Sequence, residues 1–178
     1  QYYYHAWSSE IIYFLNQQRS LLALQKAEKM KKQAFADRYP YGIFSCIRTM
    51  GHIYKSRGNF DLSAQYYQEA LDYMLKNMPD QDPSQLYSSL AEYYRNTQKD
   101  YATALDYCEK ALKSAKTERN IAQAMIEKCL VLFRQGRIDE FNDCYKEAVQ
   151  MADRCKLSAS VSLLIAHISK NILDKQYE

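Results

Sequence analysis

Five cysteines and three histidines are the residues of this 178-residue sequence best suited to metal binding or nucleophilic chemistry. They are Cys46, Cys108, Cys129, Cys144, Cys155, His5, His52 and His167. A metal site needs several such side chains on one face, yet Cys46 and His52 are six residues apart, which is roughly 240° around a helix. His5 and His167 have no partner at ligand spacing, so we expect neither a metal site nor a cofactor.

The cysteines are odd in number and show no CxxC spacing, which argues against a disulfide framework. Because 47% of the residues are hydrophobic, the chain can form a core without such cross-links. We therefore predict free, mostly buried thiols that pack between helices. On one helix Cys144 and Cys155 would lie about 16 Å apart, whereas a bond between helices, such as Cys108 with Cys129, stays open. Free thiols favour the cytoplasm, and a periplasmic sensor segment is the alternative.

Motifs of common enzyme classes are missing from the sequence. It has no phosphate-binding loop, GxGxxG, HExxH or GxSxG pattern, and its four glycines are explained by turns or helix packing. We predict a protein that is not an enzyme.

Charge and hydropathy exclude two further classes. The net charge is only +3, and lysines 26, 29, 31 and 32 spread over the outer side of a helix without interleaved aromatic residues, so we expect no nucleic-acid binding by this segment. No run of 18 apolar residues occurs, and the start "QYYYHAWSSE" has neither a signal-peptide pattern nor an initiator Met. We expect no membrane binding by this segment, and a fragment of a longer chain.

The elements that position these residues follow from a pattern that occurs three times: "GNFDLSAQYYQEAL" (58–71), "KDYATALDYCEKAL" (99–112) and "GRIDEFNDCYKEAV" (136–149). Each stretch ends in Ala followed by Leu or Val, and each has Tyr or Cys at its ninth and tenth places. A second helical pattern lies upstream of each, with apolar or small residues at offsets of three, four and seven, which places them on one helical face. Each unit is therefore predicted to be an antiparallel helix pair.

The unit that starts at Phe44 resembles the tetratricopeptide repeat, a 34-residue helix pair. The matching residues are Ile47, Met50, Gly51, Tyr54, Gly58, Asn59, Phe60, Ser63, Tyr67 and Ala70. Small residues at places 8, 20 and 27 let two helices approach, and large ones at places 4, 11, 17 and 24 fill the seams between helices. The pattern assigns five tyrosines to packing: Tyr54, Tyr67, Tyr94, Tyr101 and Tyr145. The resemblance implies an all-α, right-handed α-solenoid of antiparallel helix pairs, with about four repeats plus a C-terminal helix, in one domain over residues 1–178.

The predicted units are 2–37, which is degenerate, 44–77, 84–118 and 122–155. A helix at 157–175 caps the stack or begins another repeat. The 84–118 unit carries one extra residue in its turn, and the 122–155 unit departs from the pattern with Phe141 at the small place 20. Asp82 is predicted to cap the helix that begins at Pro83. The tyrosines at 2–4 with Trp7 either pack under the next pair or form a surface.

In this family the first helix of each pair lines a concave surface that binds peptides. The residues that the register places there are Ser45, Arg48, His52, Lys55, Gln85, Ser88, Glu92, Arg95, Gln123, Ile126, Leu130 and Phe133. They are basic and polar in the middle and apolar towards the C-terminal end, which suits an acidic partner with an apolar portion. The chaperone-type carboxylate clamp is not predicted, because its asparagine is absent and Glu92 intrudes.

The favoured function is a non-enzymatic protein- or peptide-binding domain that serves as the sensory or interaction segment of a larger bacterial regulator. The long, tyrosine-rich repeats of this sequence resemble the sensor segments of some bacterial signalling proteins. A stand-alone structural adaptor and an intracellular peptide-pheromone receptor are the alternatives.

Overall fold

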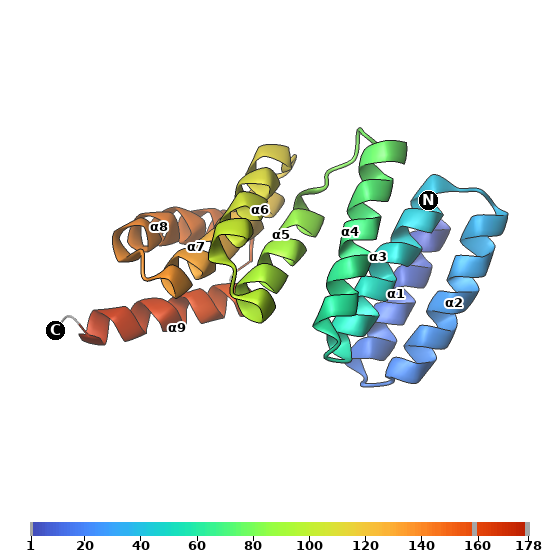
Figure 1. Cartoon of the computed structure of the whole chain (residues 1–178), viewed down its shortest axis with the longest axis horizontal. Coiled ribbons are helices and arrows are strands. Elements are labelled where there is room, and N and C mark those ends of the chain that lie inside the picture. Colours follow the sequence, from blue (N-terminus) through green and yellow to red (C-terminus); the bar gives the residue numbers. More distant parts are fainter. Residues whose placement is uncertain (1, 158–159, 177–178) are drawn as a thin grey trace. The chain divides into compact units, whose positions relative to one another are not determined.

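The computed structural model describes residues 2–157 and 160–176, and over these residues it contains nine α-helices and no strand (Figure 1). The helices are α1 (Tyr2–Asn16), α2 (Ser20–Ala36), α3 (Pro40–Ser56), α4 (Phe60–Asn77), α5 (Ser84–Tyr93), α6 (Tyr101–Ser114), α7 (Glu118–Gln135), α8 (Ile138–Arg154) and α9 (Val161–Gln176). A π-helical turn, Tyr94–Gln98, follows α5 directly. The all-α fold built from neighbouring helix pairs, predicted from the sequence, is confirmed.

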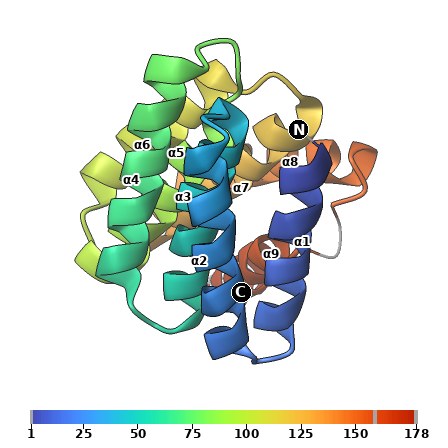
Figure 2. The ribbon, with the colours of Figure 1, turned by 90° about the vertical axis from the view of Figure 1, so that its right-hand side faces the viewer.

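The chain divides into two compact units. Unit 1 (Gln1–Gln81) holds α1 to α4, and unit 2 (Asp82–Glu178) holds α5 to α9. In unit 1, α1, α2 and α3 pack against one another and α4 packs against α3 (Figure 2). In unit 2, α7 contacts α5, α6, α8 and α9. The single domain expected over residues 1–178 stays a prediction.

The α3–α4 pair of unit 1 shows why the repeat needs small residues at set places. A Cβ on Gly51 would lie only 2.6 Å from Cε1 of the Tyr67 ring, so glycine is what lets that ring lie against α3. Ser63, on α4, donates a hydrogen bond of 2.9 Å to the carbonyl of Gly51. Asn59 caps α4 by accepting from the N–H of Leu62 at 3.2 Å. The small and large places of the repeat pattern are therefore the positions at which α3 and α4 contact each other.

Four of the five tyrosines predicted to pack are half-buried, and Tyr67 is buried. Tyr54 stacks on Tyr66, and Tyr94 stacks on Tyr107. The prediction for Phe60 is wrong: its side chain is 48% exposed rather than filling a seam. Phe60 is the first residue of α4, and α3 has already ended at Ser56. A residue at that end of the pair has less of the facing helix to pack against.

The aromatic run at the N-terminus is divided between core and surface. Tyr4 is buried, packs on Gly42 at the start of α3, and donates a hydrogen bond to Asp37. Tyr3 is exposed and Trp7 is half-buried. The side chain of Tyr2 lies outside what the structure describes. Packing under the next helix pair is thus confirmed for Tyr4 alone.

The extra residue in the second repeat is accommodated by the π-helical turn. The N–H of Lys99 donates to the carbonyl of Tyr94, five residues earlier, and Lys99 adopts a left-handed conformation with φ of 56°. A π-turn holds one residue more than an α-turn between bonded groups, so it absorbs a one-residue insertion without breaking the helix. Phe141, at the small place of the third repeat, is fully buried against Phe133 and Tyr145.

The start of α5 differs from the prediction by one residue. The helix begins at Ser84, and Pro83 rather than Asp82 takes the N-cap position. Asp82 still accepts from the N–H of Ser84 at 2.9 Å, and its other oxygen accepts from the backbone of Lys116 and the side chain of Asn120. One carboxylate thus ties the start of α5 to the chain around the start of α7.

The last helix begins later than predicted, at Val161 rather than residue 157, and residues 158–159 of the expected helix lie outside the described residues. The reason is that Leu157 closes the turn that ends α8, because its N–H donates to the carbonyl of Ala152 at 2.8 Å. Ser160 then caps α9 through the N–H of Leu163. The outer side of α9 is apolar, unlike that of a typical capping helix: Leu164, Ile165, Ile168 and Ile172 are exposed.

Candidate peptide-binding face

The most distinctive predicted site residue is Arg48, on α3 of unit 1. It lines a cavity of about 320 Å³ whose other lining residues come from α1: His5, Ser8, Ser9, Ile12, Tyr13 and Asn16. The first helices of two successive pairs therefore meet at this cavity, as expected for the binding surface of a helix-pair repeat. Polar and apolar groups line it together.

Within the part of the chain that the structure describes, the guanidinium of Arg48 lies beside an aromatic ring, and its buried Nε has no hydrogen-bond acceptor. The guanidinium carbon lies 5.3 Å from the centre of the Phe44 ring, a cation–π contact. Burial lowers the pKa of Arg48, and the titratable groups that oppose this shift are Tyr41 and Tyr67 rather than a carboxylate. A half-buried cation in this state is stabilised by an anion.

His52 adds a hydrogen bond to this face but no charge at neutral pH. Its Nδ1 lies 3.0 Å from the hydroxyl of Tyr67. Burial, followed by the nearby charges of Arg48 and Lys55, lowers the pKa of His52 to about 4. The positive charge of the predicted set in unit 1 therefore comes from Arg48 and Lys55, both of which are half-buried.

Ser45 belongs to the seam between α1 and α3 rather than to an open surface. Its side chain is fully buried, and its carbonyl accepts a hydrogen bond of 2.7 Å from Thr49. The Thr49 hydroxyl lies 3.4 Å from that of Ser8, which lines the cavity. A row of small polar groups thus leads from the seam to the cavity.

Sequence reasoning missed the contribution of α1. Its repeat is degenerate, so no motif fixed its register. A signal was present in the spacing of His5, Ser9, Ile12 and Asn16, which follow one another at three or four residues and so share a helical face.

The predicted residues of α5 and of the π-helical turn after it, in unit 2, are arranged differently. Gln85 is exposed and donates to Asn120 at 3.2 Å, while Ser88 and Glu92 are half-buried. Arg95 is buried, only 7% exposed, and its Nε lies 2.7 Å from Oε1 of Glu127 on α7. Arg95 therefore holds two helices together, and its charge is already paired.

The predicted residues of α7 are largely part of the core. Ile126 and Leu130 are buried, Phe133 is half-buried against Phe141, and Gln123 alone is exposed. Ile126 shares a cluster with Leu163 and Leu173 of α9. The apolar end of the predicted surface thus contributes to the packing of α9. Partner binding by any of the twelve residues stays a prediction.

The cysteine side chains lie mostly in the packed interior. All five cysteines are free thiols, and Cys46, Cys108 and Cys129 are buried. Within the described ranges no cluster of three or more His, Cys, Asp or Glu side chains could hold a metal ion. No helix of the described chain has the length and apolar character to cross a membrane.

Helix pairs that pack side by side, with their first helices adjoining at a cavity, define the class of α-helical repeat proteins. Residues 43–117 match the tetratricopeptide repeat family, and they include α4, α5 and α6 with most of α3. This matched part of the chain is similar to tetratricopeptide repeats, and repeats of this kind form protein–protein interaction modules on a scaffold that is generally non-catalytic. No curated protein matches the sequence.

Proposed function

We propose that the face formed by α1 and α3 binds an acidic segment of a partner protein and places a carboxylate against Arg48. The observation that supports this is the guanidinium at the cavity, whose buried Nε has no acceptor among the described residues. A carboxylate can accept two parallel hydrogen bonds from a guanidinium, and such charge-assisted bonds are stronger than neutral ones.

The remaining lining residues suit the rest of such a segment. Ile12 and the exposed Tyr13 offer apolar surface beside the cation, while Ser9 and Asn16 offer groups that bond to a peptide backbone. A cavity of about 320 Å³ accommodates one or two side chains rather than a folded domain. An extended peptide with an acidic and an apolar residue close together fits these features.

The wider role that we propose is the sensory or interaction segment of a larger bacterial regulator. Its support is the interaction-module fold together with the style of the long repeats. In such a protein, binding at α1 and α3 shifts the population of repeat conformations and so changes the output. This role is tested by the domains that the parent gene encodes next to this segment. A kinase or DNA-binding domain supports it, and a parent protein without any such output domain contradicts it.

Selection from a displayed library of short random peptides tests the acidic site. The wild-type chain is expected to enrich Asp and Glu, and the Arg48→Gln variant is expected to lose that enrichment. Arg57→Gln is the matched control, because Arg57 is exposed at the end of the same helix. For a selected peptide, Arg48→Gln should weaken binding roughly tenfold or more, equivalent to about 1.4 kcal/mol. Equal enrichment by the wild type and the Arg48→Gln variant would contradict the proposal.

A further inference from the structure

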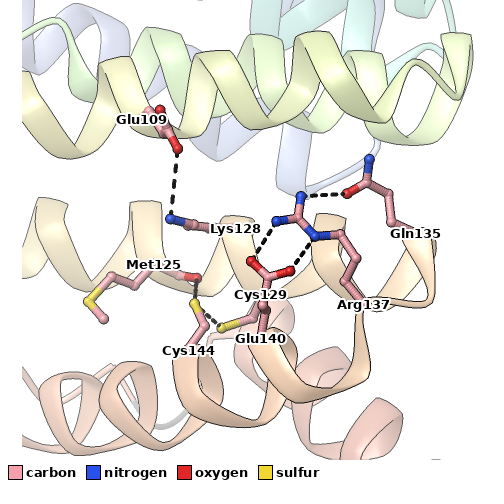
Figure 3. A network of polar contacts seen from close by, with 8 residues as sticks. All are labelled: Glu109, Met125, Lys128, Cys129, Gln135, Arg137, Glu140 and Cys144. Carbon is pink, nitrogen blue, oxygen red and sulfur yellow. Dashed lines mark hydrogen bonds and ion pairs between the residues drawn. The ribbon is translucent and has the colours of Figure 1, made fainter.

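Two thiols of unit 2 lie in direct contact. The Sγ atoms of Cys129 on α7 and Cys144 on α8 are 2.8 Å apart, and Figure 3 shows the two side chains pointing toward each other. The Sγ of Cys144 is also 3.5 Å from the carbonyl oxygen of Met125. The contact therefore lies within one helix pair, where α7 packs against α8.

The repeat register explains why these thiols meet. Cys129 occupies place 8, where Gly51 and Ala91 stand in the two preceding repeats. At that place the first helix of a pair lies against the second, because a Cβ added to Gly51 would be only 2.6 Å from the Tyr67 ring. The facing residue is not the counterpart of Tyr67, which is Tyr145, but its neighbour Cys144, at the place that Tyr66 takes in the first clear repeat.

The two cysteines differ in exposure and in the direction in which their pKa values are shifted. Cys129 is fully buried, whereas Cys144 is half-buried. The hydrogen bond from Cys129 lowers the pKa of Cys144 against the effect of burial, and the Lys128 ammonium lowers it further. The same hydrogen bond, together with burial, raises the pKa of Cys129. Cys144 is thus the more acidic thiol of the pair and the one nearer solvent, and thiolates are the reactive form of cysteine.

Several charged groups lie around the pair. Lys128 lies next to Cys129 in the chain and its ammonium is 4.0 Å from Glu109 of α6 (Figure 3). Glu147, one turn beyond Cys144 on α8, opposes the lowering of its pKa. Arg137 and Glu140 pair with each other at the start of α8. Lys128 is therefore the cation available to stabilise a thiolate on Cys144.

We propose that Cys129 and Cys144 form a dithiol modification site that a hydroperoxide oxidises to a disulfide between α7 and α8. In the first step the Cys144 thiolate attacks one peroxide oxygen, the O–O bond breaks, and the leaving oxygen takes up a proton, which gives a sulfenic acid. In the second step Cys129 sulfur attacks the Cys144 sulfur, the S–O bond breaks, and the departing hydroxide combines with the Cys129 proton as water. The two thiols lose two electrons in total, and the peroxide gains them.

The geometry needs little movement for the second step, because a disulfide bond is about 2.05 Å long and the sulfur atoms start at 2.8 Å. The other cysteines lack these features. Burial raises the pKa of Cys46 to about 11, and burial also raises that of Cys108. Cys155 is half-buried like Cys144 and serves as a matched control for exposure.

The test treats the full, folded chain with hydrogen peroxide, blocks the remaining thiols by alkylation, and maps the peptides by mass spectrometry. The expected product is a Cys129–Cys144 cross-link, with loss of two hydrogen atoms, that dithiothreitol reverses. It should form at least tenfold faster than any oxidation of Cys155. A dominant Cys108–Cys129 link, or oxidation of Cys144 no faster than that of Cys155, would overturn the proposal.

Two variants separate the roles of the two thiols. Cys129→Ala keeps a residue that this place already accepts in the preceding repeat, so the fold is expected to persist. Without its partner, Cys144 should stop at the sulfenic acid, which dimedone traps. In Cys144→Ser, Cys129 should stay reduced over the same time. If dimedone labelling of Cys144 is the same in the wild type and in Cys129→Ala, Cys129 does not react with the sulfenic acid and the proposal fails.

Discussion

Arg95 and Glu127 form a buried, bidentate ion pair that joins the π-helical turn after α5 to the middle of α7. The Nε–Oε1 and Nη2–Oε2 distances are 2.7 and 3.2 Å, and each side chain is only 7% exposed. Asn96 accepts a further hydrogen bond of 2.7 Å from Nη1. The pair contrasts with Arg48, whose charge has no such partner, although the same repeat pattern predicted both arginines as surface groups.

Breaking this pair from one side should be costly. Arg95→Met leaves the Glu127 carboxylate buried without its cation, and the loss expected for such a change is about 3–5 kcal/mol of the free energy of unfolding. Urea denaturation of the whole chain, with the unfolding of unit 2 followed, measures this loss of free energy. The double variant Arg95→Met, Glu127→Met is the control and should recover most of the loss, because it buries no charge. A single variant within 1 kcal/mol of wild type would show that the pair is not buried in solution.

Removing the charge of Arg48 should have little effect on stability. Arg48→Met loses a cation–π contact with Phe44 but also removes a poorly solvated cation, so the two effects oppose each other. We expect the unfolding free energy to stay within about 1 kcal/mol of wild type. Thermal melts of both arginine variants, run in parallel, check the contrast. A loss as large as that of Arg95→Met would mean that Arg48 is structural.

Glycine at place 8 of the first clear repeat should be hard to replace. Gly51→Ala brings a Cβ within 2.6 Å of the Tyr67 ring, and overpacking of this kind costs about 1–3 kcal/mol. The next repeat has Ala91 and Cys108 at these two places, so Gly51→Ala combined with Tyr67→Cys should be less destabilised than the sum of the single changes. A double-mutant cycle by chemical denaturation measures this coupling, and strict additivity would contradict the contact.

Acidification should destabilise unit 1 through His52. The pKa of this residue is about 4 in the folded chain, below the value of about 6.5 of an unfolded histidine, so the unfolded state binds the proton more tightly. The stability contributed by neutral His52 is full above about pH 6.5 and is lost as the pH falls towards 4. The expected loss is roughly 2–3 kcal/mol. His52→Gln should flatten this part of the pH–stability curve, and an unchanged slope would assign the effect to other groups.

Helix existence and repeat register could be predicted because they depend on local spacing. Gly51, Ser63 and Tyr67 lie where a 34-residue pattern of small and large side chains puts them, and the contacts among them follow from that pattern. The starts of α5 and α9 each lie later in the chain than the local sequence pattern predicts. Asp82 makes bonds to the chain around the start of α7 that local patterns do not contain, whereas Leu157 closes the turn at the end of α8 through a bond to Ala152 five residues earlier.

The sequence by itself determined that the chain is all-α, that its helices come in pairs, and which faces of those helices are small or large, since a period of 3.6 residues is a property of the chain alone. Only the tertiary structure decided which polar side chains find partners. It paired Arg95 with Glu127, left Arg48 beside a cavity, and brought Cys144 rather than Cys108 onto Cys129. The physical reason is that each of these outcomes depends on a second helix, whose approach is set by packing and by a one-residue insertion absorbed in a π-turn.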